Sequence, residues 1–454
     1  MKELVYPEYL YLTLLILPVV FVYARNAILR HLPLYILFAI QISRGLLDYS
    51  GYVSENTINQ ASELIVFSLF LSVVIRDRLK YSLIILLSVL VFTLISFLFN
   101  NSGFAEFLLF IRRIVIIPML IIYFSAAKYN RHNIHLESFI IAIVLVQPLA
   151  ALFKVMTYGV AEEFIGTMSV GEGSITTNFA LIAISYSFIM FLKTKNYNYF
   201  LIILIFVIFS MAGNKRATLF YIPISGFFIF YYYSIYLSDK YFDKIRNIAA
   251  SAAVIVVSLF LILTFTESIN PDSQRGGDID FASEYIYDYL TNPGRPGVEG
   301  YGRAVAPSAV GQYLMNSGSE KLLTGMGPGI LIPSRFSSTS YTTDKDILIF
   351  EYGIGYGARM GFLWTIFQIG IIGMLLYVFF YYYHFQKLMK LFKQSEKMRE
   401  YQYELLLALS FMVVFFLDFF TYSQVMFKMN SAAIIFAYVT GTRVSKSFRE
   451  LHSQ

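Results

Sequence analysis

Long apolar runs recur along this sequence and leave little room for any fold other than a bundle of membrane-spanning helices. An apolar stretch of about 20 residues is long enough to cross the hydrocarbon core of a bilayer as an α-helix. Hydrophobic residues make up 57% of the 454 residues and charged residues only 14%, a composition typical of polytopic membrane proteins. We therefore predict an all-α membrane protein with about thirteen transmembrane helices, near residues 8–24, 32–49, 60–75, 81–99, 104–126, 136–157, 176–192, 198–213, 217–237, 248–266, 359–383, 402–421 and 424–441.

One large polar segment interrupts the series of apolar runs. Residues 267–358 are rich in Gly, Pro, Ser and Asp and separate the first ten predicted spans (1–266) from the last three (359–441), with a tail at 442–454. Within this segment, Ala304 to Met315 is predicted to form a short helix directly after Arg303. The glycines of Gly325–Gly329 indicate a turn.

The loops alternate in charge, which predicts their side of the membrane. Loops near 50–59, 100–103, 158–175 and 421–424 carry no Lys or Arg, whereas the loops between them are basic. By the positive-inside rule the basic loops, the tail at 442–454 among them, are cytoplasmic. The N-terminus and the large loop 267–358 are then expected on the outer face.

Several charged residues lie where this alternation of loop charge does not predict them. Lys215 and Arg216 stand in a short turn that is expected to face outward. Arg112 and Arg113 fall in the outer half of a predicted span, and Asp418 lies just below the outer end of another. Charge inside a membrane costs several kcal/mol unless it is paired or hydrated, so we expect a polar, outward-facing cavity. Arginine side chains there would suit a lipid-linked phosphate, although snorkelling to the interface stays open for three residues nearer the span ends, namely Arg44, Lys154 and Lys428.

Composition excludes some kinds of chemistry. The chain has no cysteine, which rules out disulfides, thiolate metal sites and a cysteine nucleophile. Its net charge of +6 is explained by loop topology, so it does not indicate nucleic-acid binding.

The outward turn, the span pair after it and the large loop form a recognisable series. The loop contains "LLTGMGPG" and is followed by Arg359, which opens a span containing "GIIG". Over about residues 200–380, this arrangement resembles the O-antigen polymerase and ligase superfamily. Ligases typically carry a histidine where this chain has Arg359, whereas Wzy-type polymerases often carry an arginine. All five histidines here lie on stretches predicted to be cytoplasmic, so the chain looks most like a Wzy-type polymerase: His31, His132, His135, His384 and His452.

The resemblance implies a GT-C-like, metal-independent glycosyltransferase without a cofactor. Such an enzyme polymerises undecaprenyl-pyrophosphate-linked oligosaccharide units into a surface polysaccharide, such as the O-antigen of lipopolysaccharide. It transfers the growing glycan to a new lipid-linked unit at the outer face of the bacterial cytoplasmic (inner) membrane. Its expected partners are this lipid-linked substrate, membrane lipids, a flippase and a chain-length regulator.

Site residues follow from the same comparison. Arg216 matches the basic residue of the outward turn, Arg303 the arginine before "LLTGMGPG", and Arg359 the arginine that opens the next span. These are the expected catalytic, pyrophosphate-binding residues. An arginine cannot act as the general base because its pKa is above about 12, so Glu351 is expected in that role ahead of Glu299, Asp344, Asp346 and Asp418. Further substrate contacts are expected from Lys215, Arg112, Arg113, Tyr301 and Asp418.

Two other functions stay open. A ligase-like transferase would move finished polymer to another acceptor, but it would need the missing outward histidine. A lipid-linked oligosaccharide flippase or other transporter would need polar residues across the whole membrane depth. The charged residues within the predicted spans gather in the outer halves, which favours the polymerase.

Overall fold

The computed structural model describes residues 27–49, 55–74, 80–100, 102–125, 133–158, 166–167, 173–212, 216–238, 301–332, 347–354, 356–395 and 398–450. Within these ranges every regular element is a helix, and six helices are long and apolar enough to cross a membrane. The prediction of an all-helical membrane protein is confirmed. The total of thirteen spans stays a prediction, and the first and tenth expected spans lie outside the described residues.

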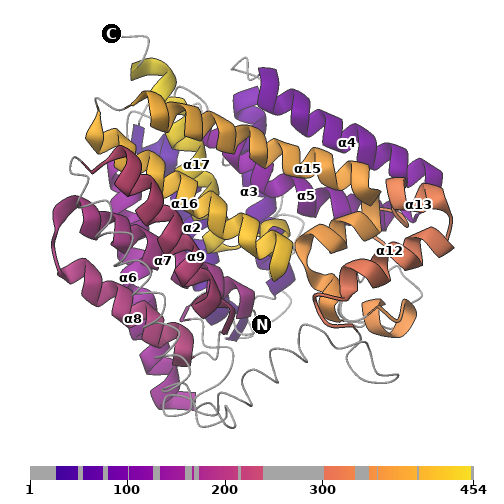
Figure 1. Ribbon diagram of the computed structural model, residues 1–454, viewed down its shortest axis with the longest axis horizontal. Helices are drawn as coiled ribbons and strands as arrows, with labels where there is room; N and C mark the ends of the chain where they lie inside the picture. Colours follow the sequence, from indigo (N-terminus) through magenta and orange to yellow (C-terminus); the bar gives the residue numbers. More distant parts are fainter. Residues whose placement is uncertain are drawn as a thin grey trace.

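The helices follow one another as labelled in Figure 1. The long ones are α2 (Ala27–Tyr49), α3 (Glu55–Val74), α4 (Lys80–Asn100), α5 (Phe104–Ser125), α6 (Asn133–Tyr158), α7 (Gly173–Thr194), α8 (Asn198–Ala212), α9 (Arg216–Tyr236), α15 (Gly361–Gln394), α16 (Arg399–Thr421) and α17 (Ser431–Glu450). The shorter ones are α12 (Ala306–Asn316), α13 (Ser319–Thr324), the π-helical turn η2 (Ile347–Glu351) and the 3₁₀ turns η3 (Tyr356–Arg359) and η4 (Val425–Phe427).

Helix α17 lies at the centre of the bundle and packs against α5 and α16. Its small residues allow this close approach, since a Cβ atom on Gly441 would stand 2.8 Å from the backbone oxygen of Ile121 on α5. The rings of Phe415 and Phe436 stack at 4.1 Å between α16 and α17. The helix continues to Glu450, through residues that the sequence analysis assigned to the tail.

Helix α4, unlike the closely packed α17, has an outer face that is apolar and exposed. Leu98 and Phe99 are 64% and 72% exposed, and other large apolar side chains line the same helix. Such a surface would be an aggregation liability in water. In a bilayer it is the face that contacts lipid, in agreement with membrane embedding.

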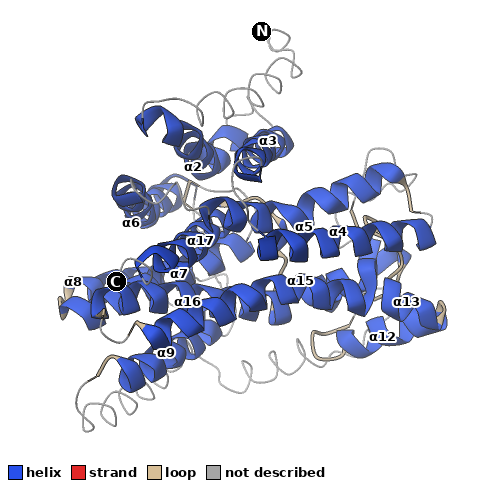
Figure 2. Ribbon diagram, turned by 90° about the horizontal axis from the view of Figure 1, so that it is seen from above, coloured by secondary structure: helices blue, strands red, loops and turns tan. Residues whose placement is uncertain are grey.

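The segment after Arg303 forms a small cap on one end of the bundle. Figures 1 and 2 show α12 and α13 together beside α15 and α4. The predicted helix at 304–315 is confirmed as α12, which begins at a proline-containing first turn. The predicted turn at Gly325–Gly329 is also confirmed, with positive φ angles at Gly325, Gly327 and Gly329.

This turn is locked onto a break in α15. Gly370 has φ 70° and ψ −179° inside the apolar helix, so carbonyl groups before it lose their helical partners. The backbone amides of Met326 and Gly327 donate hydrogen bonds to the carbonyls of Phe367 and Gln368, at 2.8 and 3.1 Å. The amides of the cap turn therefore bond the carbonyls that the break in α15 leaves without helical partners. These hydrogen bonds attach the cap to α15.

Candidate functional site

The chain between α16 and α17, residues 422–430, contacts α5, α7, α15 and α16 through its turn η4, and we call it the α16–α17 junction. Asn430 holds its shape: the side-chain amide donates to the carbonyls of Val425 and Lys428, at 3.1 and 2.8 Å. Its side-chain oxygen accepts from the amide of Ala433 at 2.8 Å, which caps α17. Arg44 on α2 donates to the carbonyl of Met429 at 3.2 Å. The segment, which includes the 3₁₀ turn η4, is thus held in place by side-chain hydrogen bonds.

A buried carboxylate anchors the start of this junction. Asp418 on α16 is 0% exposed. It accepts hydrogen bonds from the side-chain amide of Asn178 on α7 at 2.9 Å and from the hydroxyl of Ser423 at 2.6 Å. Because a buried charge is tolerated only when it is hydrogen-bonded or paired, these contacts link α7, α16 and the junction into one unit.

Arg303 reaches the same place from the cap. Its Nη1 donates to the carbonyl of Thr421 at 3.3 Å, and its guanidinium carbon lies 4.6 Å from the ring centroid of Tyr422. Stacking on an aromatic face is a favourable position for an arginine. The guanidinium also lies within electrostatic range of the Asp418 carboxylate. Arg303 is therefore pre-oriented at the junction while remaining partly exposed.

Arg359 is brought to the junction by the chain that follows the cap. The amide of Gly357 donates to the carbonyl of Tyr301 at 3.0 Å, so the segments that carry Arg303 and Arg359 are hydrogen-bonded to each other. Two residues after Arg359, Gly361 packs so tightly that a Cβ atom would stand 2.9 Å from the carbonyl oxygen of Ser423. The substrate contact expected of Tyr301 stays a prediction.

The start of α9 lies at the junction as well. Tyr221 shares a 2.5 Å hydrogen bond with the hydroxyl of Thr421, and its ring meets that of Tyr422 edge-on at 6.3 Å. Helix α9 begins at Arg216, about 7 Å along the helix axis from Tyr221. The side chain of Arg216 and the whole of Lys215 lie outside the described residues, as does the side chain of Lys154.

Arg112 and Arg113 have a partner that sequence reasoning missed. Arg112 Nε lies 2.9 Å from a carboxylate oxygen of Glu63 on α3, and Arg113 is within electrostatic range of the same carboxylate. Arg112 and Glu63 border a groove of about 490 Å³ between α3 and α5. A glutamate inside the apolar run at 60–75 was the signal available in the sequence. The structure thus gives Arg112 a carboxylate of its own chain as partner.

Glu351, the expected base, lies beside aromatic side chains of the cap. Burial raises the pKa of Tyr352 above its ordinary value, and the neighbouring Glu351 carboxylate adds to this shift. The same two causes raise the pKa of Tyr313 on α12. Tyr313 lies about 10 Å along the axis of α12 from the start of that helix. Arg303 comes shortly before this start. Arg303 lies within electrostatic range of the Asp418 carboxylate, which the sequence analysis named among the substrate contacts and as a lower-ranked candidate base.

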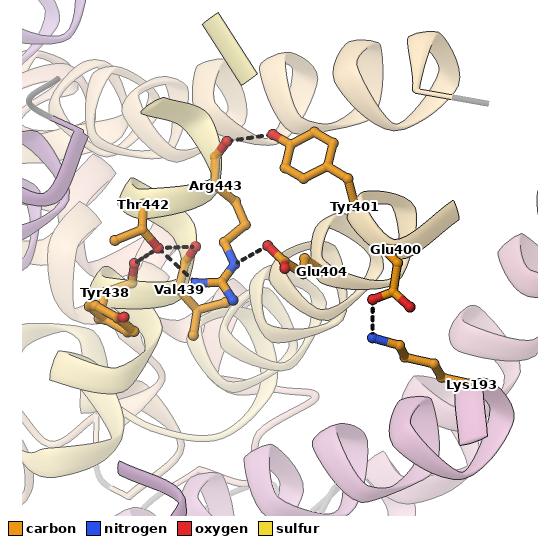
Figure 3. A network of polar contacts seen from close by, with 8 residues as sticks. All are labelled: Lys193, Glu400, Tyr401, Glu404, Tyr438, Val439, Thr442 and Arg443. Carbon is orange, nitrogen blue, oxygen red and sulfur yellow. Dashed lines mark hydrogen bonds and ion pairs between the residues drawn. The ribbon is translucent and has the colours of Figure 1, made fainter. Parts of the chain in front are cut away.

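Charged residues also pair at the end of α16 and α17 that lies away from the junction, and Figure 3 draws these contacts. Arg443 is 4% exposed, and its Nε lies 3.4 Å from Glu404. Tyr401 donates to the carbonyl of Arg443 at 2.8 Å, and Lys193 pairs with Glu400 nearby. Arg443 thus adds a buried charge at the end of these helices that lies away from the junction. The sequence analysis assigned it to the cytoplasmic tail, because its partner lies on another helix.

Comparison with known proteins adds no relative. No protein-family model matches this chain, and no curated protein matches it either. Within the residues that the structure describes, no three His, Asp or Glu side chains come together in a way that could hold a metal ion.

Proposed function

We propose that this protein polymerises lipid-linked oligosaccharide units into a long glycan at the α16–α17 junction. The observation that carries the proposal is the convergence of segments far apart in the sequence. Arg303 donates to the carbonyl of Thr421 at this junction, Gly361 after Arg359 packs against Ser423, and Tyr221 near the start of α9 bonds Thr421. The resemblance to Wzy-type polymerases names Arg216, Arg303 and Arg359 for pyrophosphate binding.

The proposed reaction uses this positive charge in one step. A hydroxyl of the acceptor sugar attacks the anomeric carbon of the donor glycan and forms a new C–O bond. The bond between that carbon and the pyrophosphate breaks, and the pyrophosphate leaves with the electron pair. Negative charge grows on the leaving group, so fixed guanidinium groups stabilise the transition state more than the ground state. Bidentate contacts of arginine suit phosphate oxygens.

The hydroxyl proton needs an acceptor. Glu351 is an exposed carboxylate shortly before Arg359, and it remains our candidate. Asp418 is fully buried and already accepts two hydrogen bonds. We assign it to holding the junction, and through it Arg303, in place.

A lipid-linked oligosaccharide transporter is the second candidate. The pair of buried Arg443 with partly exposed Glu404 favours it, because polar residues at both ends of the central helices are what a path across the membrane requires. Against it, the segments that carry Arg303 and Arg359 meet at one junction, as expected for a reaction at one face.

The test is a gel of surface glycan from a bacterial strain whose only copy of the gene carries Arg359→Ala. Arg359→Lys, Arg303→Ala and the control Lys390→Ala, an exposed residue of α15 outside the junction, are run beside it at equal protein level. We expect the first three to lose the long-chain ladder while single repeat units still reach the surface, and the control to keep the ladder. Loss of single units as well would favour the transporter. An unchanged ladder in both Ala variants would overturn the polymerase.

A further inference from the structure

A cavity of about 400 Å³ separates α6 from the centre of the bundle. Its walls come from α6 and α8 on one side and from α7, α16 and α17 on the other. Among the described helices, α6 packs closely only against α8. A helix in a bundle usually makes dense contacts with its neighbours, so this space calls for an occupant. We name it the α6 cavity.

The lining of the α6 cavity is apolar along its body and polar at one end. Val144 on α6 faces Ala183 on α7 and Phe411 on α16 across it, and α17 contributes further apolar side chains. Asn196, in the turn between α7 and α8, and Asn198, the first residue of α8, form the polar end. From this turn to Ala183 the cavity extends about 18 Å along α7. A long apolar slot with one polar end matches an amphipathic chain.

Two lysines are next to the polar end in the sequence, although neither is part of the lining: Lys193 in the last turn of α7 and Lys195 directly before Asn196. Among the described residues, Lys193 pairs with the carboxylate of Glu400. Lys195 donates to the hydroxyl of Tyr233 at 3.3 Å, an uncharged group. The local balance of these three charges is positive, and lysines at a membrane surface attract anionic lipid.

We propose that the α6 cavity binds one anionic phospholipid of the leaflet that meets the α7–α8 turn. One acyl chain lies between α6 and the central helices, and the phosphate of the head group lies at the amides of Asn196 and Asn198 beside the two lysines. Water would gain few hydrogen bonds against the apolar walls, whereas methylene groups restore the missing dispersion contacts. The lipid completes the packing of α6. This site is separate from the α16–α17 junction, so it does not rest on the proposed polymerase reaction.

The test measures phospholipid retained by the full-length protein, purified in a mild detergent and examined by native mass spectrometry. Ala183→Phe and Val144→Phe fill the cavity from opposite walls. Leu149→Phe, at a position of α6 that is 67% exposed and outside the lining, is the matched control. We expect one retained phospholipid in the wild type and the control, and its loss in both cavity variants. Retention by both cavity variants, or its absence from the wild type, would overturn the proposal.

The choice of head group is tested separately. Delipidated wild-type protein is mixed with vesicles of phosphatidylglycerol or phosphatidylcholine, and the lipid taken up is counted. We expect preferential uptake of phosphatidylglycerol, and a loss of that preference in Lys195→Gln with total uptake maintained. Equal uptake of the two lipids by the wild type would refute an anionic head-group site.

Discussion

The break in α15 at Gly370 offers the sharpest test of how the cap is attached. The substitution Gly370→Ala adds a single methyl group at a position with φ 70° and ψ −179°. That backbone conformation is essentially limited to glycine. The added Cβ atom would also stand 2.0 Å from the carbonyl oxygen of Leu323, a distance that forces the cap turn to move.

The cost can be worked from these contacts. A non-glycine residue in this conformation costs about 1–3 kcal/mol. Displacement of the turn breaks the hydrogen bonds from Met326 and Gly327 to the carbonyls of Phe367 and Gln368, each contributing about 0.5–1.5 kcal/mol. We therefore expect Gly370→Ala to lower the free energy of unfolding by about 2–6 kcal/mol. That is a large share of the usual stability of about 5–15 kcal/mol.

The chain provides its own probe for this measurement. Trp364 is the single tryptophan, is fully buried and stacks on Phe110 of α5 at a centroid distance of 5.5 Å. Thermal unfolding in detergent, followed by tryptophan fluorescence, therefore reports on the first part of α15. The matched control is Gly311→Ala in α12, where an added Cβ atom meets nothing within 4 Å.

We expect the control to leave the melting temperature unchanged or to raise it, because alanine is favoured over glycine in a helix by about 0.5–1 kcal/mol. If Gly370→Ala melts together with Gly311→Ala, the reasoning is refuted, and the cap is not held by the break in α15.

Two further predictions concern the junction. Asp418→Ala removes the charged acceptor of Asn178 and Ser423, so we expect the free energy of unfolding to fall by about 1.5–3 kcal/mol per hydrogen bond; thermal unfolding measures this, and an unchanged melting temperature would contradict it. Tyr422→Leu removes the ring beneath Arg303, worth about 0.5–2 kcal/mol. We expect shorter glycan chains at normal protein level, with Tyr422→Phe retaining wild-type chain length; equal lengths in the two variants would argue against the stacking contact.

The positions of many helices could be predicted from the sequence alone. The apolar run expected at 104–126 is α5, Phe104–Ser125, and the run expected at 81–99 is α4, Lys80–Asn100. Hydropathy is a local property, since about 20 apolar residues in a row satisfy the bilayer whatever their neighbours are. Turn chemistry is local too, so the glycines at 325–329 and the helix after Arg303 were also foreseen.

The sequence did not indicate the break in α15, although both of its parts were visible. "GIIG" and "LLTGMGPG" were noted as separate signals, yet only their contact shows that one satisfies the backbone groups that the other exposes. An apolar run with a glycine reads as a continuous span, because hydropathy is insensitive to the direction of backbone carbonyls.

Tertiary structure alone decided the partners of the charged residues. Asp418 and Asn178 are 240 positions apart in the chain, and nothing local to either residue predicts the other. The sequence by itself determined that this chain enters the membrane as helices, and it singled out Arg303 and Arg359. Which helices stand side by side, and therefore which arginine meets a carboxylate, depends on packing between segments far apart in the chain. The energy of a buried charge is set by those neighbours.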